Sequence, residues 1–207
     1  MKIDEILKTK LTETILFLAQ KGWSPGTGGN FSVVSNQSPL ELFMSPSSID
    51  KTQINQSQII TVDSDGKVIK GHGKSSAETA IHLVLCKKYG AKSVLHTHSI
   101  WNTSLSRKIK PFESITLSGY EMLKALGEST HDTVVEIPVF PNTQDIDFFA
   151  QMLDDEYEKY KSMKAFLMAG HGLYCWGDSI ESAKRHTEAV EFLLECYGVE
   201  NFIIKNF

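Results

Sequence analysis

The sequence of 207 residues lacks the features that define several large classes of protein. It contains no run of roughly 18 or more apolar residues, so no segment reads as a membrane-spanning helix. Its first twenty residues mix charged and apolar side chains, which is not the pattern of a secretory signal peptide. No repeat, linker or low-complexity block interrupts the chain. We therefore expect one cytoplasmic domain over residues 1–207.

Cysteine and excess positive charge are also scarce. Cys86, Cys175 and Cys196 are odd in number and form no CxxC pair, which argues against a disulfide framework and against a cysteine zinc site. The 21 Lys and Arg residues are outnumbered by 25 Asp and Glu residues, giving a formal net charge of −4. Because nucleic-acid binding needs many phosphates to be neutralised, we expect a small ligand or a protein as partner, and neither nucleic acid nor membrane.

Helix-like and strand-like patterns are intermingled along the chain. Apolar residues recur at helical spacing from Ile3 to Leu18, and short β-branched runs then follow from Phe31. Further helices are expected over 76–89, after 98, over 121–126, 144–160 and 179–197, and further strands over 93–96, 133–140, 165–170 and 173–176. The early strands are joined by links too short for helical crossovers. The pattern predicts an α/β fold of three α/β/α layers around a mixed, largely antiparallel sheet.

Three histidines stand at the ends of predicted strands. His96 and His98 follow an apolar run, and in an extended segment residues two apart point to the same side. His171 lies between two glycines after another apolar strand. Three neutral imidazoles with a position left open are a typical catalytic zinc site. Solvated histidines at a strand end are the alternative; His72, His82, His131 and His186 are assigned surface, hydrogen-bonding or core roles.

Glycine and hydroxyl residues gather in three segments before the histidines. The segment 26–30 reads GTGGN and offers unobstructed backbone N–H groups to an anion. Ser47 and Ser48 lie in SPSS, and Lys74 and Ser76 lie in KSS before a helix. Each serine taken alone is better explained as a helix cap. Three such segments together favour a phosphorylated substrate.

Two acidic residues are candidates for proton transfer. Glu78 lies in the first turn of a predicted helix, and Glu121 lies at the start of another in GYEML. A carboxylate in either position is also explained by the favourable interaction with the helix dipole. The sequence alone leaves both readings open.

The motifs GTGGNFS, SPSS, KSSAET, HTH, GYEMLKAL and AGHG occur in this order over most of the chain. In this arrangement the sequence resembles the class II aldolase/epimerase/dehydratase family. The segments KSSAET, GYEMLKAL and AKRHTEAVEFLLE resemble its dehydratase branch. In that branch a proline commonly takes the place of Ser75, so the resemblance supports Ser75 less than Ser76 as a phosphate contact.

The resemblance implies a ligand set and a site. His96, His98 and His171 match the zinc ligands, one ion per subunit. The phosphate site matches Gly29, Asn30, Ser47, Ser48, Lys74 and Ser76. Glu121 matches the acid of the dehydratase branch and is expected to be the base. Glu78 matches the acid that aldolases use for proton transfer.

The resemblance also implies an activity and an assembly. We expect a zinc-dependent lyase that eliminates water from a small phosphorylated ketose, and a homotetramer with the site near a subunit boundary. The apolar segment from Val199 to Ile204 is a candidate contact surface. The alternatives are an aldolase or epimerase acting on another short sugar phosphate, such as fuculose or ribulose phosphate, and a non-catalytic scaffold of the same fold.

Overall fold

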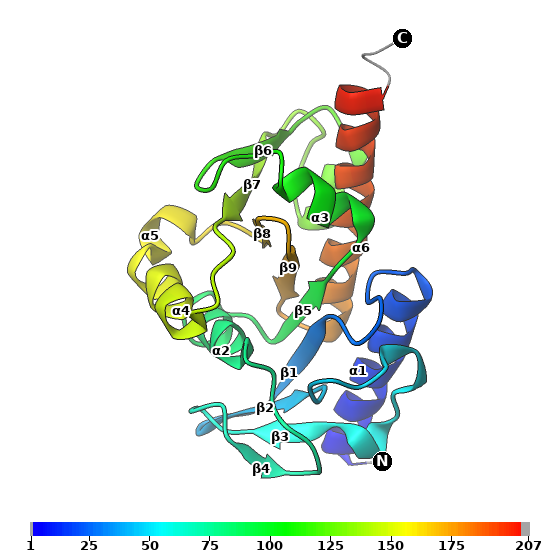
Figure 1. Ribbon diagram of the computed structural model, residues 1–207, viewed down its shortest axis with the longest axis vertical. Coiled ribbons are helices and arrows are strands. Elements are labelled where there is room, and N and C mark those ends of the chain that lie inside the picture. The colour runs from blue at the N-terminus through cyan, green and yellow to red at the C-terminus, as the bar shows by residue number, and fades with distance from the viewer. Residues whose placement is uncertain (1, 204–207) are drawn as a thin grey trace.

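A single mixed sheet forms the centre of the protein, for which the computed structural model describes residues 2–203 (Figure 1). Its nine strands lie in the order β4-β3-β2-β1-β5-β9-β8-β7-β6. Among these described strands only β7 and β8 pair in parallel, and every other neighbouring pair is antiparallel. The strands are β1 Asn30–Gln37, β2 Leu40–Met44, β3 Ile60–Val62, β4 Val68–Lys70, β5 Ser93–Thr97, β6 Ser114–Leu117, β7 Val135–Phe140, β8 Ala165–Met168 and β9 Gly172–Gly177.

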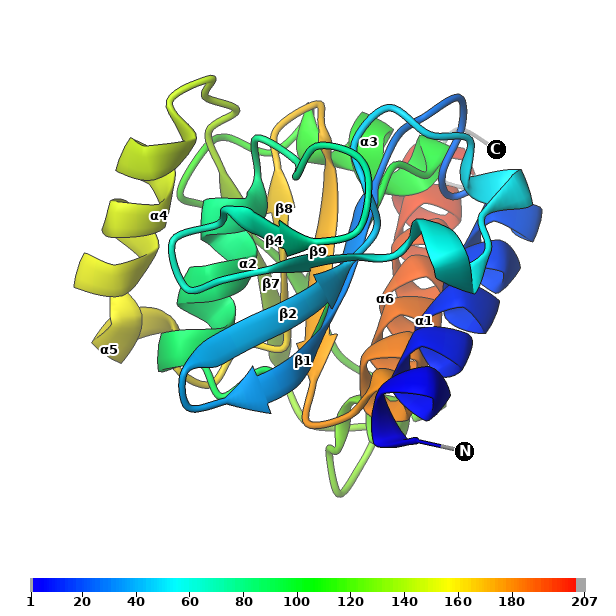
Figure 2. The ribbon, with the colours of Figure 1, turned by 90° about the horizontal axis from the view of Figure 1, so that it is seen from below.

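Helices cover both faces of the sheet. Figure 2 shows α1 and α6 on one side of the strands and α2, α4 and α5 on the other, so the expected three layers are confirmed. The α-helices are α1 Ile3–Gln20, α2 Thr79–Lys88, α3 Ile100–Ser106, α4 Ile146–Asp155, α5 Tyr157–Tyr160 and α6 Ile180–Gly198. Short 3-10 helices are η1 Lys51–Gln53, η2 Gln56–Gln58 and η3 Glu121–Leu126, and η4 Val199–Ile203 is a π-helix.

The helical spacing of apolar residues near the N-terminus places them on one buried face of α1. Leu11, Ile15 and Leu18 of α1 are fully buried and pack with Phe31 and Val33 of β1. Burying each leucine or isoleucine stabilises the fold by about 1.5–3 kcal/mol. None of the helices within residues 2–203 combines the length and the apolar character needed to cross a membrane.

Two elements differ from the sequence prediction. The helix expected over 144–160 is divided at Glu156, where ψ is 11° and the helical conformation is interrupted. The helix expected over 121–126 is present with these bounds, as the 3-10 helix η3. Strand β6 was not predicted; it is a four-residue edge strand, and its pairing with β7 is what makes it a strand.

The order of the central strands determines which residues and loops lie next to the HxH segment at the end of β5. Strand β5 lies between β1 and β9, antiparallel to both, as Figure 1 shows in the middle of the molecule. Its register places His96 opposite Asn30 on one side and opposite Tyr174 on the other. The glycine-rich loop before β1 and the turn between β8 and β9 therefore both adjoin the HxH segment.

Candidate active site

The three predicted histidines converge. His96 and His98 come from the end of β5, and His171 comes from the turn between β8 and β9. The Nε2 atoms of His96 and His98 are 2.8 Å apart, and one ring nitrogen of each of the three histidines lies within 4.8 Å of the others. The sequence prediction that these residues form one cluster is confirmed.

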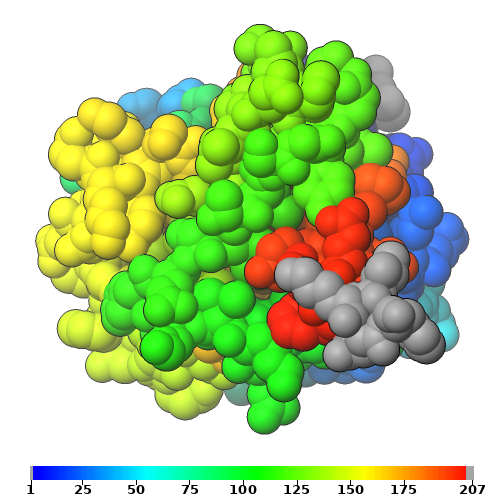
Figure 3. All heavy atoms as spheres, turned by 90° about the horizontal axis from the view of Figure 1, so that it is seen from above, coloured from blue at the N-terminus to red at the C-terminus, as the bar shows by residue number. Residues whose placement is uncertain are grey.

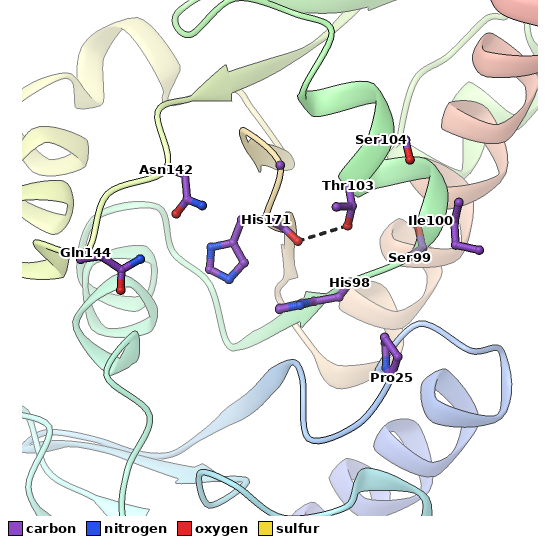
Figure 4. Close-up of a pocket in the computed structure, with 10 residues that line it drawn as sticks. Pro25, His98, Ser99, Ile100, Thr103, Ser104, Asn142, Gln144 and His171 are labelled. Atoms are coloured by element: carbon purple, nitrogen blue, oxygen red, sulfur yellow. Dashed lines mark hydrogen bonds between the residues drawn. The ribbon is translucent and has the colours of Figure 1, made fainter.

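Close backbone packing brings the histidine-bearing segments together. A Cβ atom on Gly172 would overlap the carbonyl oxygen of Thr97 and would lie 2.8 Å from Cε1 of His96. The Thr103 hydroxyl donates to the His171 carbonyl at 3.2 Å, which fixes the turn (Figure 4). The glycine after His171 is therefore required by the approach of β9 to β5.

The chemistry of the cluster fits a divalent metal ion. Nδ1 of His96 donates to the Leu173 carbonyl at 3.0 Å, so Nε2 of the neutral ring carries no proton and its lone pair faces His98. Burial is the main reason why the pKa of His96 lies well below its ordinary value, and the nearby His98 and His171 lower it further. Burial is also the main reason why the pKa of His98 is lowered to about 4. Nδ1 of His171 is buried without a hydrogen-bond partner among the described residues. Three imidazoles at this spacing, each with a ring nitrogen directed at the others, are a metal-ligand set.

Glu78 lies directly beside this cluster. Its Oε1 atom is 3.2 Å from Nε2 of His171, and its Oε2 atom is 3.5 Å from Nε2 of His96. The side chain is only 13% exposed, and Oε2 accepts a hydrogen bond from Nδ2 of Asn30 at 2.5 Å. A carboxylate held in this position can exchange a proton with a molecule bound at the histidines.

Glu121 occupies a different part of the chain. It begins η3, its side chain is 70% exposed, and it accepts a hydrogen bond from Lys124 at 2.5 Å. Nδ1 of His131 lies 3.6 Å from Oε2 of Glu121. The Lys124 ammonium holds the pKa of Glu121 below its ordinary value. Within residues 2–203 the fold thus joins Glu78, but not Glu121, to the histidines.

The predicted phosphate-binding segments form one rim next to Glu78. Nδ2 of Asn30 lies 3.3 Å from the Ser76 hydroxyl, and the backbone N–H of Ser47 donates to the Lys74 carbonyl at 2.8 Å. Ser47, Ser48 and Lys74 are exposed on this rim. The three segments that the sequence analysis grouped are therefore in contact.

Gly29 joins this rim to the histidines. Its φ of +78° is left-handed, and a Cβ atom there would lie 2.7 Å from the His96 carbonyl oxygen. A side chain at this position would be strained in conformation and would also collide with the strand that carries the histidine. The rim and the histidine cluster are thus parts of one site.

An open pocket of about 600 Å³ lies against His98 and His171 (Figure 4). Its wall is completed by Pro25, Ser99, Ile100, Thr103, Ser104, Asn142, Gln144 and Gly170. Asn142 and Gln144 lie across from the two histidines, so amide groups and imidazoles face the same space. The volume is that of a site for a small organic molecule.

The sequence analysis missed two buried charged residues that shape the site. Glu191 on α6 accepts hydrogen bonds from Thr97 at 2.9 Å, Ser99 at 2.6 Å and Asn102 at 2.8 Å, which anchors the segment around His98. Burial raises the pKa of this carboxyl group. The only signal in the sequence was an acidic residue among the apolar positions of the last helix.

Lys51 is the second missed residue. Its ammonium is buried and donates to the carbonyls of Thr27 at 3.2 Å and Ile49 at 3.1 Å. It therefore ties the glycine-rich loop to the segment that follows SPSS. Burial lowers the pKa of Lys51 to about 8.

Comparison with known proteins places the chain among related enzymes. Residues 9–197 match the family described as Class II Aldolase and Adducin N-terminal domain. The chain is 39% identical over 188 residues to a methylthioribulose-1-phosphate dehydratase from Stenotrophomonas maltophilia, covering 90% of this chain and 87% of the relative. It is 40% identical over 195 residues to the enzyme of the same name from Citrobacter koseri, covering 93% and 94%.

A solved structure supports the fold assignment. YgbL from Escherichia coli superposes with a TM-score of 0.82 at 23% identity, covering 98% of this chain and 93% of the other. At this level of identity the likeness concerns the fold alone. It agrees with the three layers and the mixed sheet described above.

Proposed function

The chain belongs to the class II aldolase and adducin family, and from this premise we propose that it is a zinc-dependent methylthioribulose-1-phosphate dehydratase. The reaction removes water from 5-methylthioribulose 1-phosphate to give 2,3-diketo-5-methylthiopentyl 1-phosphate, a step of methionine salvage. The observation that carries the proposal is the identity of about 40% to dehydratases over at least 90% of the chain, together with Glu78 beside three clustered histidines.

His96, His98 and His171 would hold one zinc ion per subunit. When bound, the ion supplies Lewis-acid polarisation of the ketose carbonyl, which acidifies the neighbouring carbon. The chain's own contribution is to orient the imidazoles, as the hydrogen bond from Nδ1 of His96 to the Leu173 carbonyl does for His96.

Two proton transfers drive the elimination, one from C3 of the ketose and one to the departing C4 hydroxyl, and the enol that remains then tautomerises to the diketone. Glu78 is held beside the histidines and serves one of them. We assign the other to Glu121, the expected base, acting on the site of a neighbouring subunit. Its exposure and its place outside the pocket of its own chain support an action between subunits.

We assign binding of the substrate phosphate to Gly29, Asn30, Ser47, Ser48, Lys74 and Ser76. The hydrogen bonds of Ser76 show how its hydroxyl group could contact the phosphate. Its Oγ atom accepts from the Glu78 backbone N–H at 3.2 Å and faces the Asn30 amide at 3.3 Å, so its own proton is available for a phosphate oxygen.

Ser76→Ala is expected to lower kcat/KM for the phosphorylated ketose by roughly ten- to a hundredfold, because a neutral donor to a charged acceptor contributes about 1.5–3 kcal/mol. Metal content should not change. Ser75→Ala is the matched control, since the Ser75 hydroxyl donates away from the rim to the Gly66 carbonyl. If Ser76→Ala prefers phosphorylated over dephosphorylated ketose as strongly as the wild type, the serine is only a helix cap.

A homotetramer is the expected assembly. Phe112, Val134, Phe202 and Ile203 are all exposed large apolar residues, and a monomer gains nothing by exposing them. Figure 3 shows the end of the molecule where residues of the green segment lie beside the red end of α6. Ile204, the last residue of the predicted contact segment, lies outside the described residues. Light scattering should give four times the chain mass, and a monomer at all concentrations would contradict the assembly.

Substrate specificity is the direct test of the proposed function. The kcat/KM for 5-methylthioribulose 1-phosphate should exceed that for L-fuculose 1-phosphate and ribulose phosphates. Equal or better cleavage of L-fuculose 1-phosphate would assign the chain to the aldolases. Turnover of none of these compounds by the metal-loaded protein would favour a scaffold of the same fold.

A further inference from the structure

A line of buried hydrogen bonds leads from strand β1 through helix α2 to Glu78. The Ser32 hydroxyl lies 2.7 Å from Nδ1 of His82, and Nε2 of the same ring lies 2.5 Å from Oδ1 of Asn30. Nδ2 of Asn30 then lies 2.5 Å from Oε2 of Glu78. His82 is fully buried and touches none of the three metal-ligating histidines through a hydrogen bond in the described chain.

The Glu78 carboxylate at the end of this line determines which atom donates in each of its hydrogen bonds. Oε2 of Glu78 accepts the hydrogen bond from Nδ2 of Asn30, so Asn30 presents its NH₂ group to Glu78 and its carbonyl oxygen to His82. Nε2 of His82 must then carry the ring proton. Burial lowers the pKa of His82 to about 3, so the ring is neutral and Nδ1 is left to accept from the Ser32 hydroxyl.

The other neighbour of the Asn30 amide cannot set this direction. Ser76 lies 3.3 Å from Nδ2, but a hydroxyl group both donates and accepts, so it tolerates either orientation of the amide. With the amide turned over, the Asn30 carbonyl would face the Glu78 carboxylate and repel it. The carboxylate therefore selects the orientation of the amide, and the imidazole, donating from Nε2 to the Asn30 carbonyl, holds the amide in it before any substrate is present.

We propose that His82 is a positioning residue for the reaction: by donating from Nε2 it fixes the Asn30 amide so that Nδ2 holds Oε2 of Glu78. The other carboxylate oxygen, Oε1, remains directed at the histidine cluster, 3.2 Å from Nε2 of His171. The inference rests on the proposed function for the role of Glu78. It goes beyond that function because it gives His82, a buried residue of α2, a role at the site and requires its ring to be protonated on Nε2.

Replacement of His82 by glutamine or by methionine separates this role from simple packing. The side-chain nitrogen of glutamine stands as many bonds from the backbone as Nε2 of histidine, whereas methionine has a similar length and no donor. His82→Met should lower kcat by about ten- to a hundredfold with KM and metal content near the wild-type values. His82→Gln should recover most of that loss.

His186→Met is the matched control for removing a buried histidine. His186 lies on α6, its Nδ1 donates to the Trp176 carbonyl at 2.7 Å, and within residues 2–203 no hydrogen bond joins it to Glu78. Its variant should keep the wild-type kcat even where stability falls. Equal losses in His82→Met and His82→Gln, or no loss in either, would overturn the proposal.

Nitrogen-15 NMR of the wild-type protein tests the same inference without a variant. The His82 ring should carry its proton on Nε2, with Nδ1 unprotonated. Protonation on Nδ1 would overturn the proposal even if every kinetic result agreed. If the wild type dehydrates no ketose phosphate, the proposed function fails, while the NMR result still decides the tautomer.

Discussion

His98→Ala is expected to leave the purified protein with almost no bound zinc, against about one ion per chain in the wild type. Nε2 of His98 lies 2.8 Å from Nε2 of His96, so the substitution would remove one of the three proposed ligands and open the site to water. Turnover should fall to background with it. Elemental analysis of the dialysed protein measures the metal independently of activity.

His72→Ala is the control for this experiment, because His72 is exposed and lies outside the cluster. It should keep its zinc. Full zinc occupancy in a His96→Ala, His98→Ala double variant would show that the metal is bound elsewhere, and the assignment of the three histidines would then be withdrawn.

Glu78→Gln is expected to lower turnover by roughly 10²- to 10⁴-fold while zinc content and KM stay near those of the wild type. Glutamine keeps the shape and polarity of the side chain but cannot take up a proton. Glu121→Gln is expected to cause a loss of the same order. Near-normal turnover in Glu121→Gln would leave the proton transfers to Glu78 alone.

Mixing the two variants tests whether the acids act across a subunit boundary. A Glu121→Gln chain retains Glu78, and a neighbouring Glu78→Gln chain retains Glu121, so mixed assemblies contain some complete sites. Activity should return after subunit exchange between two nearly inactive preparations. No recovery, with exchange verified by mass, would contradict a role of Glu121 in a neighbouring site.

The histidine cluster was predictable because local rules determine most of it. The two-residue period of a strand places His96 and His98 on one side, and glycines next to His171 indicate a close backbone approach. The mixed sheet was predictable from strand links too short for crossovers. In these places local pattern and tertiary structure agree.

The supporting residues were not predictable in the same way. Glu191 meets Thr97 and Ser99 across more than ninety residues of sequence, and no periodicity indicates that pairing. His82 reads as an ordinary helix residue until the fold sets it against Asn30. The short strand β6 depends on its partner β7. Such contacts arise from the packing of distant segments, which a single sequence does not reveal.

The central claim is that the zinc-loaded protein removes water from its ketose phosphate, and the mass of the product tests it most directly. Incubation with 5-methylthioribulose 1-phosphate should give a single phosphorylated product lighter than the substrate by one water, and the Glu78→Gln protein should give almost none. Two shorter fragments would reveal aldol cleavage, and a product of unchanged mass would reveal epimerisation. Either result would contradict the account.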